Sequence, residues 1–126
     1  MNLLQSQALW RNYPALQFAV LVGSRATGQQ HATSDWDIAV QWNPATDWGQ
    51  ALALTESLRL DIAKDLALSP ELVDLIDLRR ANLTMRASVA EEGLPLVVPD
   101  ERAWNHFLQR TWRDLEDFYW DRRHAA

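Results

Sequence analysis

Residues 35–42, DWDIAVQW, alternate between large apolar side chains and acidic, small or polar ones. Neighbouring side chains of a β-strand point to opposite faces of the sheet. One face of this stretch is therefore apolar and carries Trp36, Ile38, Val40 and Trp42. Asp35 and Asp37 share the other face, with their Cα atoms about 6.6 Å apart at a rise of ~3.3 Å per residue. The pattern predicts a strand of the core whose second face holds two carboxylates that lean towards one point.

Periodicity and capping residues predict the remaining elements. We expect a helix within residues 3–12, strands at 16–22, 71–78 and 94–98, and helices at about 48–66, 82–92 and from Pro99–Asp100 onwards. Asp47 and Asn82 are expected to cap helices, Gly93 to end one in a left-handed conformation, and Pro95 to place its strand at a sheet edge. The predicted fold is α+β (α/β mixed), a small mixed sheet of about four strands packed with helices.

Two helical stripes are predicted to face the core. The first comprises Trp48, Ala51, Leu52, Thr55, Leu58, Ile62 and Leu66. The second, on the last helix, comprises Trp104, Phe107, Leu108, Thr111, Leu115, Phe118 and Tyr119. Trp112 and Trp120 fall off that stripe, and the pattern leaves open whether they form a second buried edge or an interface.

Length and composition limit the classes of function. A chain of 126 residues fits one domain, 1–126, and its formal charge of −5 argues against binding nucleic acid through a broad basic face. It has no cysteine and three scattered histidines, so a Cys-ligated zinc site is excluded and a His-rich metal site is not expected. No stretch approaches the ~20 apolar residues of a membrane span. We expect a cytoplasmic protein without membrane or direct nucleic-acid contact.

Gly23–Ser24, at the end of the apolar run 16–22, predicts a phosphate site. Glycine lets the backbone approach a ligand closely, and Ser24 is expected to cap a following helical turn whose free N–H groups attract phosphate. Arg25 adds a cation with a planar donor fork beside that site. Two carboxylates facing a low-dielectric sheet would repel each other, and a Mg²⁺ ion shared with phosphate oxygens removes that difficulty.

A third acid is expected on the neighbouring strand. Asp74 and Asp77 are the candidates, and they point to opposite faces of that strand. Each has apolar neighbours, so the periodicity does not choose between them.

The spacing of these motifs resembles a known family. The "GS" at 23–24, ten intervening residues and the "DWD" at 35–37 match the signature of the DNA polymerase β-like nucleotidyltransferase superfamily, and "VDLIDL" at 73–78 is similar to its third-carboxylate strand. The flanking "GSRATG" and "SDWD" look most like its smallest members, the minimal nucleotidyltransferases or MntA-type antitoxins. The resemblance spans roughly residues 16–98.

The resemblance assigns roles to individual residues. It places metal ligands on Asp35 and Asp37, and it places the third carboxylate, which would share a second Mg²⁺, on Asp74 in preference to Asp77. It also places the phosphate-binding pair on Gly23 and Ser24. Trp36 departs from the family, which usually has an aliphatic residue there, and we expect a change of packing at that point.

The resemblance also implies an activity and a partner. MntA-type antitoxins transfer AMP from ATP to a tyrosine of a HEPN-fold, HepT-type RNase toxin and release pyrophosphate. We therefore expect a protein adenylyltransferase that uses Mg²⁺ and ATP and forms a hetero-oligomer with its toxin. Two alternatives remain: an antitoxin that neutralises its toxin by binding alone, and a nucleotidyltransferase acting on a small-molecule hydroxyl.

Overall fold

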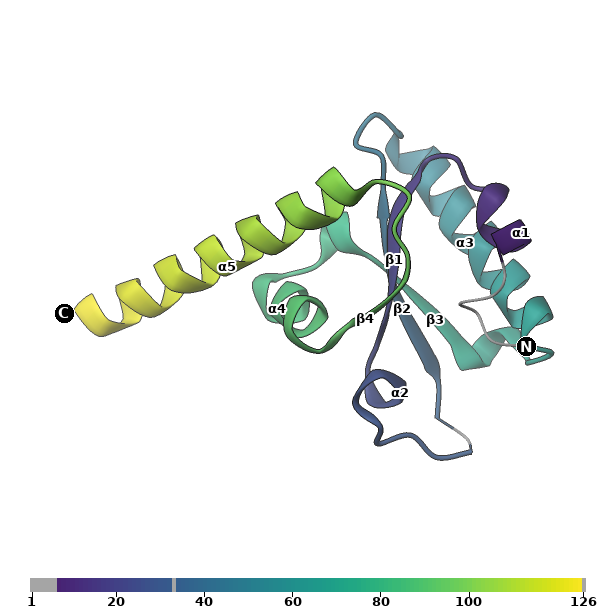
Figure 1. Cartoon of the computed structure of the whole chain (residues 1–126), viewed down its shortest axis with the longest axis horizontal. Helices are drawn as coiled ribbons and strands as arrows, with labels where there is room; N and C mark the ends of the chain where they lie inside the picture. The colour runs from purple at the N-terminus through teal and green to yellow at the C-terminus, as the bar shows by residue number, and fades with distance from the viewer. Residues whose placement is uncertain (1–6, 33, 126) are drawn as a thin grey trace.

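The computed structural model describes residues 7–32 and 34–125, and its centre is a four-stranded mixed sheet (Figure 1). The strand order is β3-β2-β1-β4; β1 pairs antiparallel with both β2 and β4, and β2 pairs parallel with β3. The strands are β1 Leu16–Val22, β2 Trp36–Trp42, β3 Val73–Asp77 and β4 Leu94–Val97. The predicted fold class is confirmed, as is the edge position of β4.

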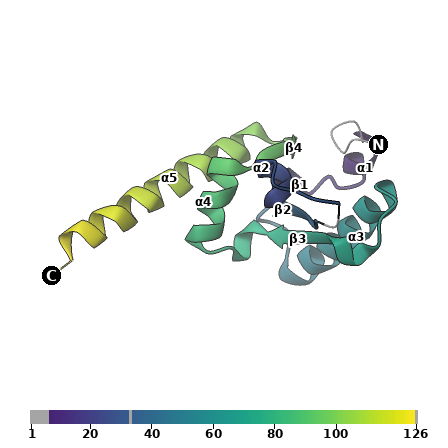
Figure 2. The same ribbon diagram turned by 90° about the horizontal axis from the view of Figure 1, so that it is seen from below.

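Helices cover both faces of the sheet (Figures 1 and 2). The α-helices are α1 Gln7–Arg11, α2 Ser24–Thr27, α3 Trp48–Asp65, α4 Leu83–Glu92 and α5 Glu101–His124, and two 3₁₀ turns, η2 Pro70–Leu72 and η3 Leu78–Arg80, flank β3. α1 and α3 lie on one face, and α4 with the first half of α5 lies on the other. Residues 3–6 of the first predicted helix lie outside the described residues.

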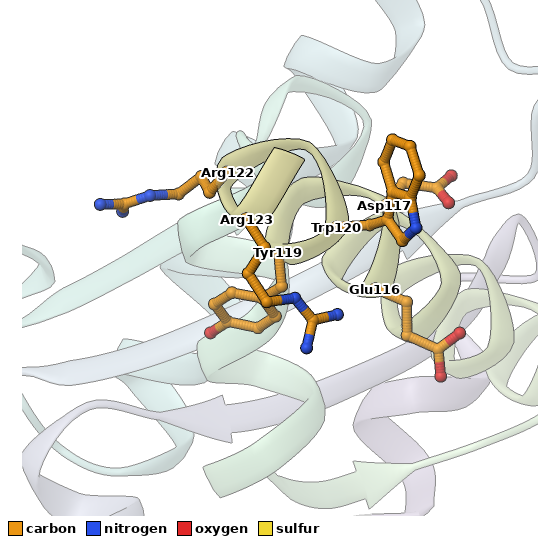
Figure 3. A pocket seen from close by; sticks show the side chains of 6 residues that line it. All are labelled: Glu116, Asp117, Tyr119, Trp120, Arg122 and Arg123. Atoms are coloured by element: carbon orange, nitrogen blue, oxygen red, sulfur yellow. The ribbon is translucent and has the colours of Figure 1, made fainter. Parts of the chain in front are cut away.

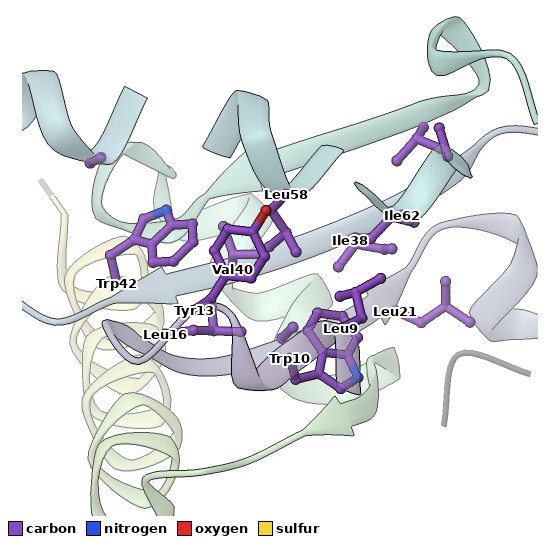
Figure 4. Close-up of a cluster of buried hydrophobic side chains, with 14 residues drawn as sticks. Leu9, Trp10, Tyr13, Leu16, Leu21, Ile38, Val40, Trp42, Leu58 and Ile62 are labelled. Atoms are coloured by element: carbon purple, nitrogen blue, oxygen red, sulfur yellow. The ribbon is translucent and has the colours of Figure 1, made fainter. Parts of the chain in front are cut away.

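Each face of the sheet has its own core. Towards α3, the apolar face of β2 packs Ile38, Val40 and Trp42 against Leu58 and Ile62 (Figure 4). Towards α4 and α5, the buried side chains are Phe18, Val20, Val22, Ala39, Leu78, Val89 and Phe107. The alternation predicted for β2 is confirmed, because Ala39 belongs to the second core and its neighbours on both sides to the first.

Local capping explains where the two central helices begin. Asp47 accepts a hydrogen bond from the Gln50 N–H at 2.8 Å, while the Gln50 side chain accepts one from the Asp47 N–H at 3.3 Å, which completes a capping box. Asn82 accepts from the Met85 N–H at 2.9 Å and begins α4. Both caps were predicted from the sequence.

The expectations for Trp48, Leu52 and Gly93 are wrong. Trp48 and Leu52 are about half exposed, at 55% and 50%, although Ala51 between them is buried, so they lie on a side of α3 that does not face the core. Gly93 is not left-handed but has a φ of −69°. Its glycine is required instead by close packing, since a Cβ there would lie 2.5 Å from Val20 Cγ1.

The outer half of α5 has no covering layer within the described residues. The inner part is held by Phe18 of β1, whose ring centroid lies 4.9 Å from that of Trp104 and 5.6 Å from that of Phe107, and by an ion pair of 3.0 Å between Arg86 of α4 and Asp114. Beyond it the helix projects from the body (Figure 1), and Phe118 and Tyr119, predicted to be core, are exposed. A helix of this length extends about 36 Å, which is longer than the face it covers.

No helix of the described residues is both long enough and apolar enough to cross a membrane.

Candidate active site

The site lies where the end of β1 meets the beginnings of β2 and β3. Asp37 is paired with Val22 of β1 on one side and with Asp74 of β3 on the other. Paired residues of neighbouring strands have side chains on the same face, and the strands are about 4.8 Å apart. The register therefore brings Asp74 directly beside Asp37.

Asp35 completes a group of three carboxylates. It comes immediately before the first residue of β2, Trp36, and is exposed, while Asp37 is half-buried. Burial raises the pKa of Asp37 above its ordinary value, and the charges of Asp74 and then Asp35 raise this pKa further. The three acids thus interact, although Asp74 is 37 residues further along the chain than Asp37.

Gly23 is in direct contact with the central carboxylate. Its backbone has φ 73° and ψ −158°, a conformation that is open almost only to glycine. A Cβ at this position would lie 2.5 Å from Asp37 Oδ2, closer than side-chain atoms approach. Glycine is therefore required at position 23 for two separate reasons: the backbone conformation of the turn after β1 and the space that the Asp37 carboxylate occupies.

Ser24 begins α2 and does not cap it. The N-cap is Gly23, and no side-chain hydrogen bond caps this short helix, so the predicted capping role of Ser24 is wrong. The N–H groups of a first helical turn have no partner within the helix. In α2 the Ala26 and Thr27 N–H groups donate to the Gly23 carbonyl oxygen, at 3.0 and 3.3 Å, so the candidates for contact with a phosphate are the Ser24 and Arg25 N–H groups, which directly follow the glycine beside Asp37.

Arg25 contacts the segment before β2. Its Nε and Nη2 both donate to the carbonyl oxygen of Ser34, at 3.2 and 2.9 Å, and its Cζ lies 4.4 Å from the centroid of the Trp36 ring. The side chain thus spans from α2 to both neighbours of Asp35. Sequence reasoning missed Ser34, because a backbone carbonyl leaves no signature in the sequence.

The comparison with known families agrees with this geometry. The model of the family described as polymerase beta, nucleotidyltransferase matches residues 5–102, which is more than half of the chain and includes Gly23, the three acids and α4. This chain belongs to that family.

Two kinds of relative support the membership. The protein adenylyltransferase MntA of Shewanella oneidensis is 38% identical over 86 residues, or 68% of this nucleotidyltransferase and 56% of that protein. The chain therefore aligns with little more than half the length of this curated relative.

Solved structures extend the likeness to nearly the whole chain. A chain in the crystal structure of a toxin–antitoxin with AMP-PNP superposes with a TM-score of 0.73 at 28% identity and covers 98% of this chain and 94% of that one. A rebuilt structure of tri-AMPylated Shewanella oneidensis HEPN toxin in complex with MNT antitoxin gives a TM-score of 0.61 at 27% identity, over 92% and 85% of the two chains.

Asp77 of this nucleotidyltransferase has a structural task instead. It pairs in register with Val40, whose side chain faces α3, so it lies on the sheet face opposite to Asp37 and Asp74. Its Oδ1 accepts a hydrogen bond from the Arg79 N–H at 3.0 Å and begins the 3₁₀ turn η3. Of the two acids that the sequence left open, the structure brings Asp74 to the site.

The three carboxylates provide donors of the kind that Mg²⁺ prefers. Within the described residues none of them forms an ion pair with a lysine or arginine. In the same part of the chain, no three acidic or histidine side chains are grouped closely enough to hold a metal ion unaided. Mg²⁺ is usually bound by one or two carboxylates together with water and substrate phosphates, and Asp35 and Asp37 fit that donor set.

A hollow of about 780 Å³ lies on the outer half of α5, far from these acids in the fold (Figure 3). Its lining residues are Glu116, Asp117, Tyr119, Trp120, Arg122 and Arg123. All of them belong to a single helix, and one helix cannot enclose a ligand. The hollow is open surface beside exposed side chains, and we assign no part of the nucleotide chemistry to it.

Proposed function

We propose that this nucleotidyltransferase is a Mg²⁺-dependent adenylyltransferase that moves AMP from ATP to a tyrosine of a HEPN-family RNase toxin. The main support is the position of Asp37, which has Gly23 on one side and Asp74 on the other. One end of the sheet thereby carries both a glycine turn that a phosphate can approach and a group of acids, close enough together to contact one nucleotide. Binding alone would not require this arrangement.

The proposed metal ligands are Asp35 and Asp37, with Asp74 as the third carboxylate. When bound there, Mg²⁺ supplies positive charge that offsets the triphosphate and the departing pyrophosphate. Gly23 and Ser24 contribute backbone N–H groups beside the phosphates, and their main effect is to position the substrate.

The proposed step is an in-line displacement at the α-phosphorus of ATP. The tyrosine oxygen forms a new bond to that phosphorus, and the bond from the α-phosphorus to the bridging oxygen breaks and releases pyrophosphate. Asp74 accepts the phenolic proton, because it borders the acidic group on the side away from Gly23. The products are tyrosyl-AMP and pyrophosphate.

Relatives support the choice of acceptor and partner. The similar MntA protein is named a protein adenylyltransferase, and similar chains occur in structures with AMP-PNP and with a tri-AMPylated HEPN toxin. We extend those properties to this chain, which would then form a hetero-oligomer with its own toxin in the cytoplasm, where ATP and RNA are present.

The test measures the mass of the toxin. The chain is incubated with Mg²⁺, ATP and a candidate HEPN-family RNase toxin from the same genome, and the intact toxin is then weighed and assayed for RNase activity. We expect the toxin mass to rise by whole AMP units and RNase activity to fall, and the double variant Asp35→Asn/Asp37→Asn to abolish the mass increase. Neutralisation without any change of toxin mass would instead favour an antitoxin that acts by binding alone.

Asp74 and Asp77 provide a matched pair for the third carboxylate. Asp74→Asn should reduce AMP transfer at least 100-fold, roughly the contribution of a general base, with the unfolding free energy nearly unchanged. Asp77→Asn keeps a side-chain oxygen that can accept from the Arg79 N–H, so it should leave both the unfolding free energy and AMP transfer nearly unchanged. If the two variants exchanged these effects, the assignment of Asp74 would be wrong.

A further inference from the structure

Asp35 lies outside the hydrogen-bonded ladder of the sheet. The antiparallel pairing of β2 with β1 ends at Asp37, and its parallel pairing with β3 ends at Trp36. Asp35 is also exposed and has no hydrogen bond or ion pair of its side chain among the described residues. Its position therefore depends on what holds the residues next to it.

Arg25 holds both of those neighbours. The two donors Nε and Nη2 converge on the carbonyl oxygen of Ser34, and the guanidinium carbon Cζ lies over the ring of Trp36. Ser34 is itself buried, at 8% exposure, and its Oγ accepts a hydrogen bond from the His31 N–H at 2.9 Å. One side chain from α2 thus fixes the residues before and after Asp35.

We infer that Arg25 is a positioning residue, which holds Asp35 in place through Ser34 and Trp36 rather than by acting on phosphate. This inference rests on the proposed AMP transfer only for its activity readout. It replaces the expectation that Arg25 binds phosphate, because two of its three guanidinium nitrogens are already directed at the Ser34 carbonyl.

The chemistry of the contact requires arginine. Two donors on one carbonyl need the guanidinium fork, and stacking on an indole needs its flat, weakly hydrated face. Lysine keeps the charge but has neither property. Trp36 provides the indole, at a position where the resemblance described above implies an aliphatic residue for most of the family, so the contact depends on the tryptophan of this chain.

The activity test compares Arg25→Lys with Arg80→Lys. Arg80 also lies over a tryptophan, with its Cζ 4.5 Å from the Trp48 ring centroid. It comes after the C-terminal end of β3, whereas Asp74 lies near the N-terminal end of that strand. We expect Arg25→Lys to lower kcat for AMP transfer roughly 10- to 100-fold, as a misplaced catalytic group does, with little change in KM for ATP. Arg80→Lys should leave both constants near those of the wild type.

Trp36→Leu separates positioning from direct phosphate contact. It leaves the charge of Arg25 in place and removes only the stacking surface, so it should lower kcat in the same direction, and its effect should not add to that of Arg25→Lys. A phosphate ligand would behave otherwise: lysine would retain most of the activity, the remaining loss would appear in KM, and Trp36→Leu would be silent. That result would overturn the inference.

A second readout does not depend on activity. Amide hydrogen exchange in peptides containing residues 34–37 should be faster in Arg25→Lys than in the wild type or Arg80→Lys, while urea unfolding confirms that all three proteins are folded. If the wild type transferred no AMP to the toxin, the proposed function would fail, and exchange would still decide the role of Arg25. Unchanged exchange at residues 34–37 would refute it.

Discussion

At position 23 both the backbone conformation and the lack of room for a Cβ atom exclude residues other than glycine. The residue turns the chain from β1 into α2 with a positive φ, and its Cα faces the Asp37 carboxylate. Gly28, which ends α2, also has a positive φ, of 77°, but a Cβ there would meet nothing within 4 Å. A comparison of substitutions at the two glycines therefore separates the energetic cost of a positive φ from the displacement of the Asp37 carboxylate.

Gly23→Ala and Gly28→Ala should therefore differ in activity more than in stability. Each alanine is forced into a conformation that costs about 1–3 kcal/mol, so both should lower the unfolding free energy measured in urea. Only Gly23→Ala also displaces Asp37, and only this variant should lose AMP transfer. Full transfer by Gly23→Ala would show that Asp37 tolerates displacement and is not a metal ligand.

Asp37 predicts an unusual dependence of stability on pH. Its raised pKa means that the folded state holds this proton more tightly than the unfolded state does, so ionisation opposes folding. As pH rises from the unfolded pKa of about 3.9 through the raised folded pKa, wild-type stability should fall relative to Asp37→Asn.

The measurement is urea unfolding of both proteins without Mg²⁺ between about pH 3.5 and about pH 7. This range begins just below the ordinary aspartate pKa of ~3.9. At neutral pH the asparagine variant should be the more stable protein, and at the acid end the difference should disappear. A variant less stable than the wild type at pH 7 would mean that the Asp37 carboxylate has a stabilising partner.

Contacts between elements hold the segment after α1 against α3. Tyr13 is buried, and its hydroxyl donates to Asp61 Oδ2 and lies 2.9 Å from Ser57 Oγ, with both partners on α3. Its ring packs beside Trp42, whose Nε1–H donates to Thr55 Oγ1 at 2.9 Å. Burial and the hydrogen bond to Asp61 raise the pKa of Tyr13, so the hydroxyl stays protonated as a donor.

The two tyrosines of the chain give a test of this connection. Tyr13→Phe should lower the unfolding free energy by about 1–3 kcal/mol, because Asp61 and Ser57 lose a buried partner. Tyr119→Phe, on the exposed part of α5 at 56% exposure, should change it by less than ~0.5 kcal/mol. Equal effects in urea unfolding would contradict a structural role for the Tyr13 hydroxyl.

The molecule as a whole consists of one sheet with a core on each face. Because β1 and β2 contribute side chains to both cores, loss of either core exposes the other, and we predict that the chain unfolds as one domain. The exception is the end of α5, where residues 118–125 are exposed and contribute little to either core.

Truncation of α5 tests that division. A chain ending at Asp117 should retain its unfolding free energy within about 0.5 kcal/mol. A chain ending at Gln109 loses the buried Thr111 and the Arg86–Asp114 ion pair and should be destabilised by more than ~2 kcal/mol. A large loss in the longer chain would show that the outer half of α5 packs against the body.

The sequence predicted features that depend on near neighbours. A period of two places Asp35 and Asp37 on one face of β2, and short-range hydrogen bonds identify the caps Asp47 and Asn82. Both signals involve residues at most a few positions apart, so the chain itself determines them. The spacing from Gly23 to Asp37 was equally readable, and the structure brings these two residues into contact.

Only the tertiary structure decided which distant residues meet. The register of β3 on β2 chose Asp74 over Asp77, and the side of α3 that packs on the sheet left Trp48 exposed. Packing against Val20 explained Gly93, and the Ser34 carbonyl showed what Arg25 contacts. A pattern along one strand or helix states which side chains share a face. It carries no information on which element lies against that face, because that is set by packing among segments far apart in the chain.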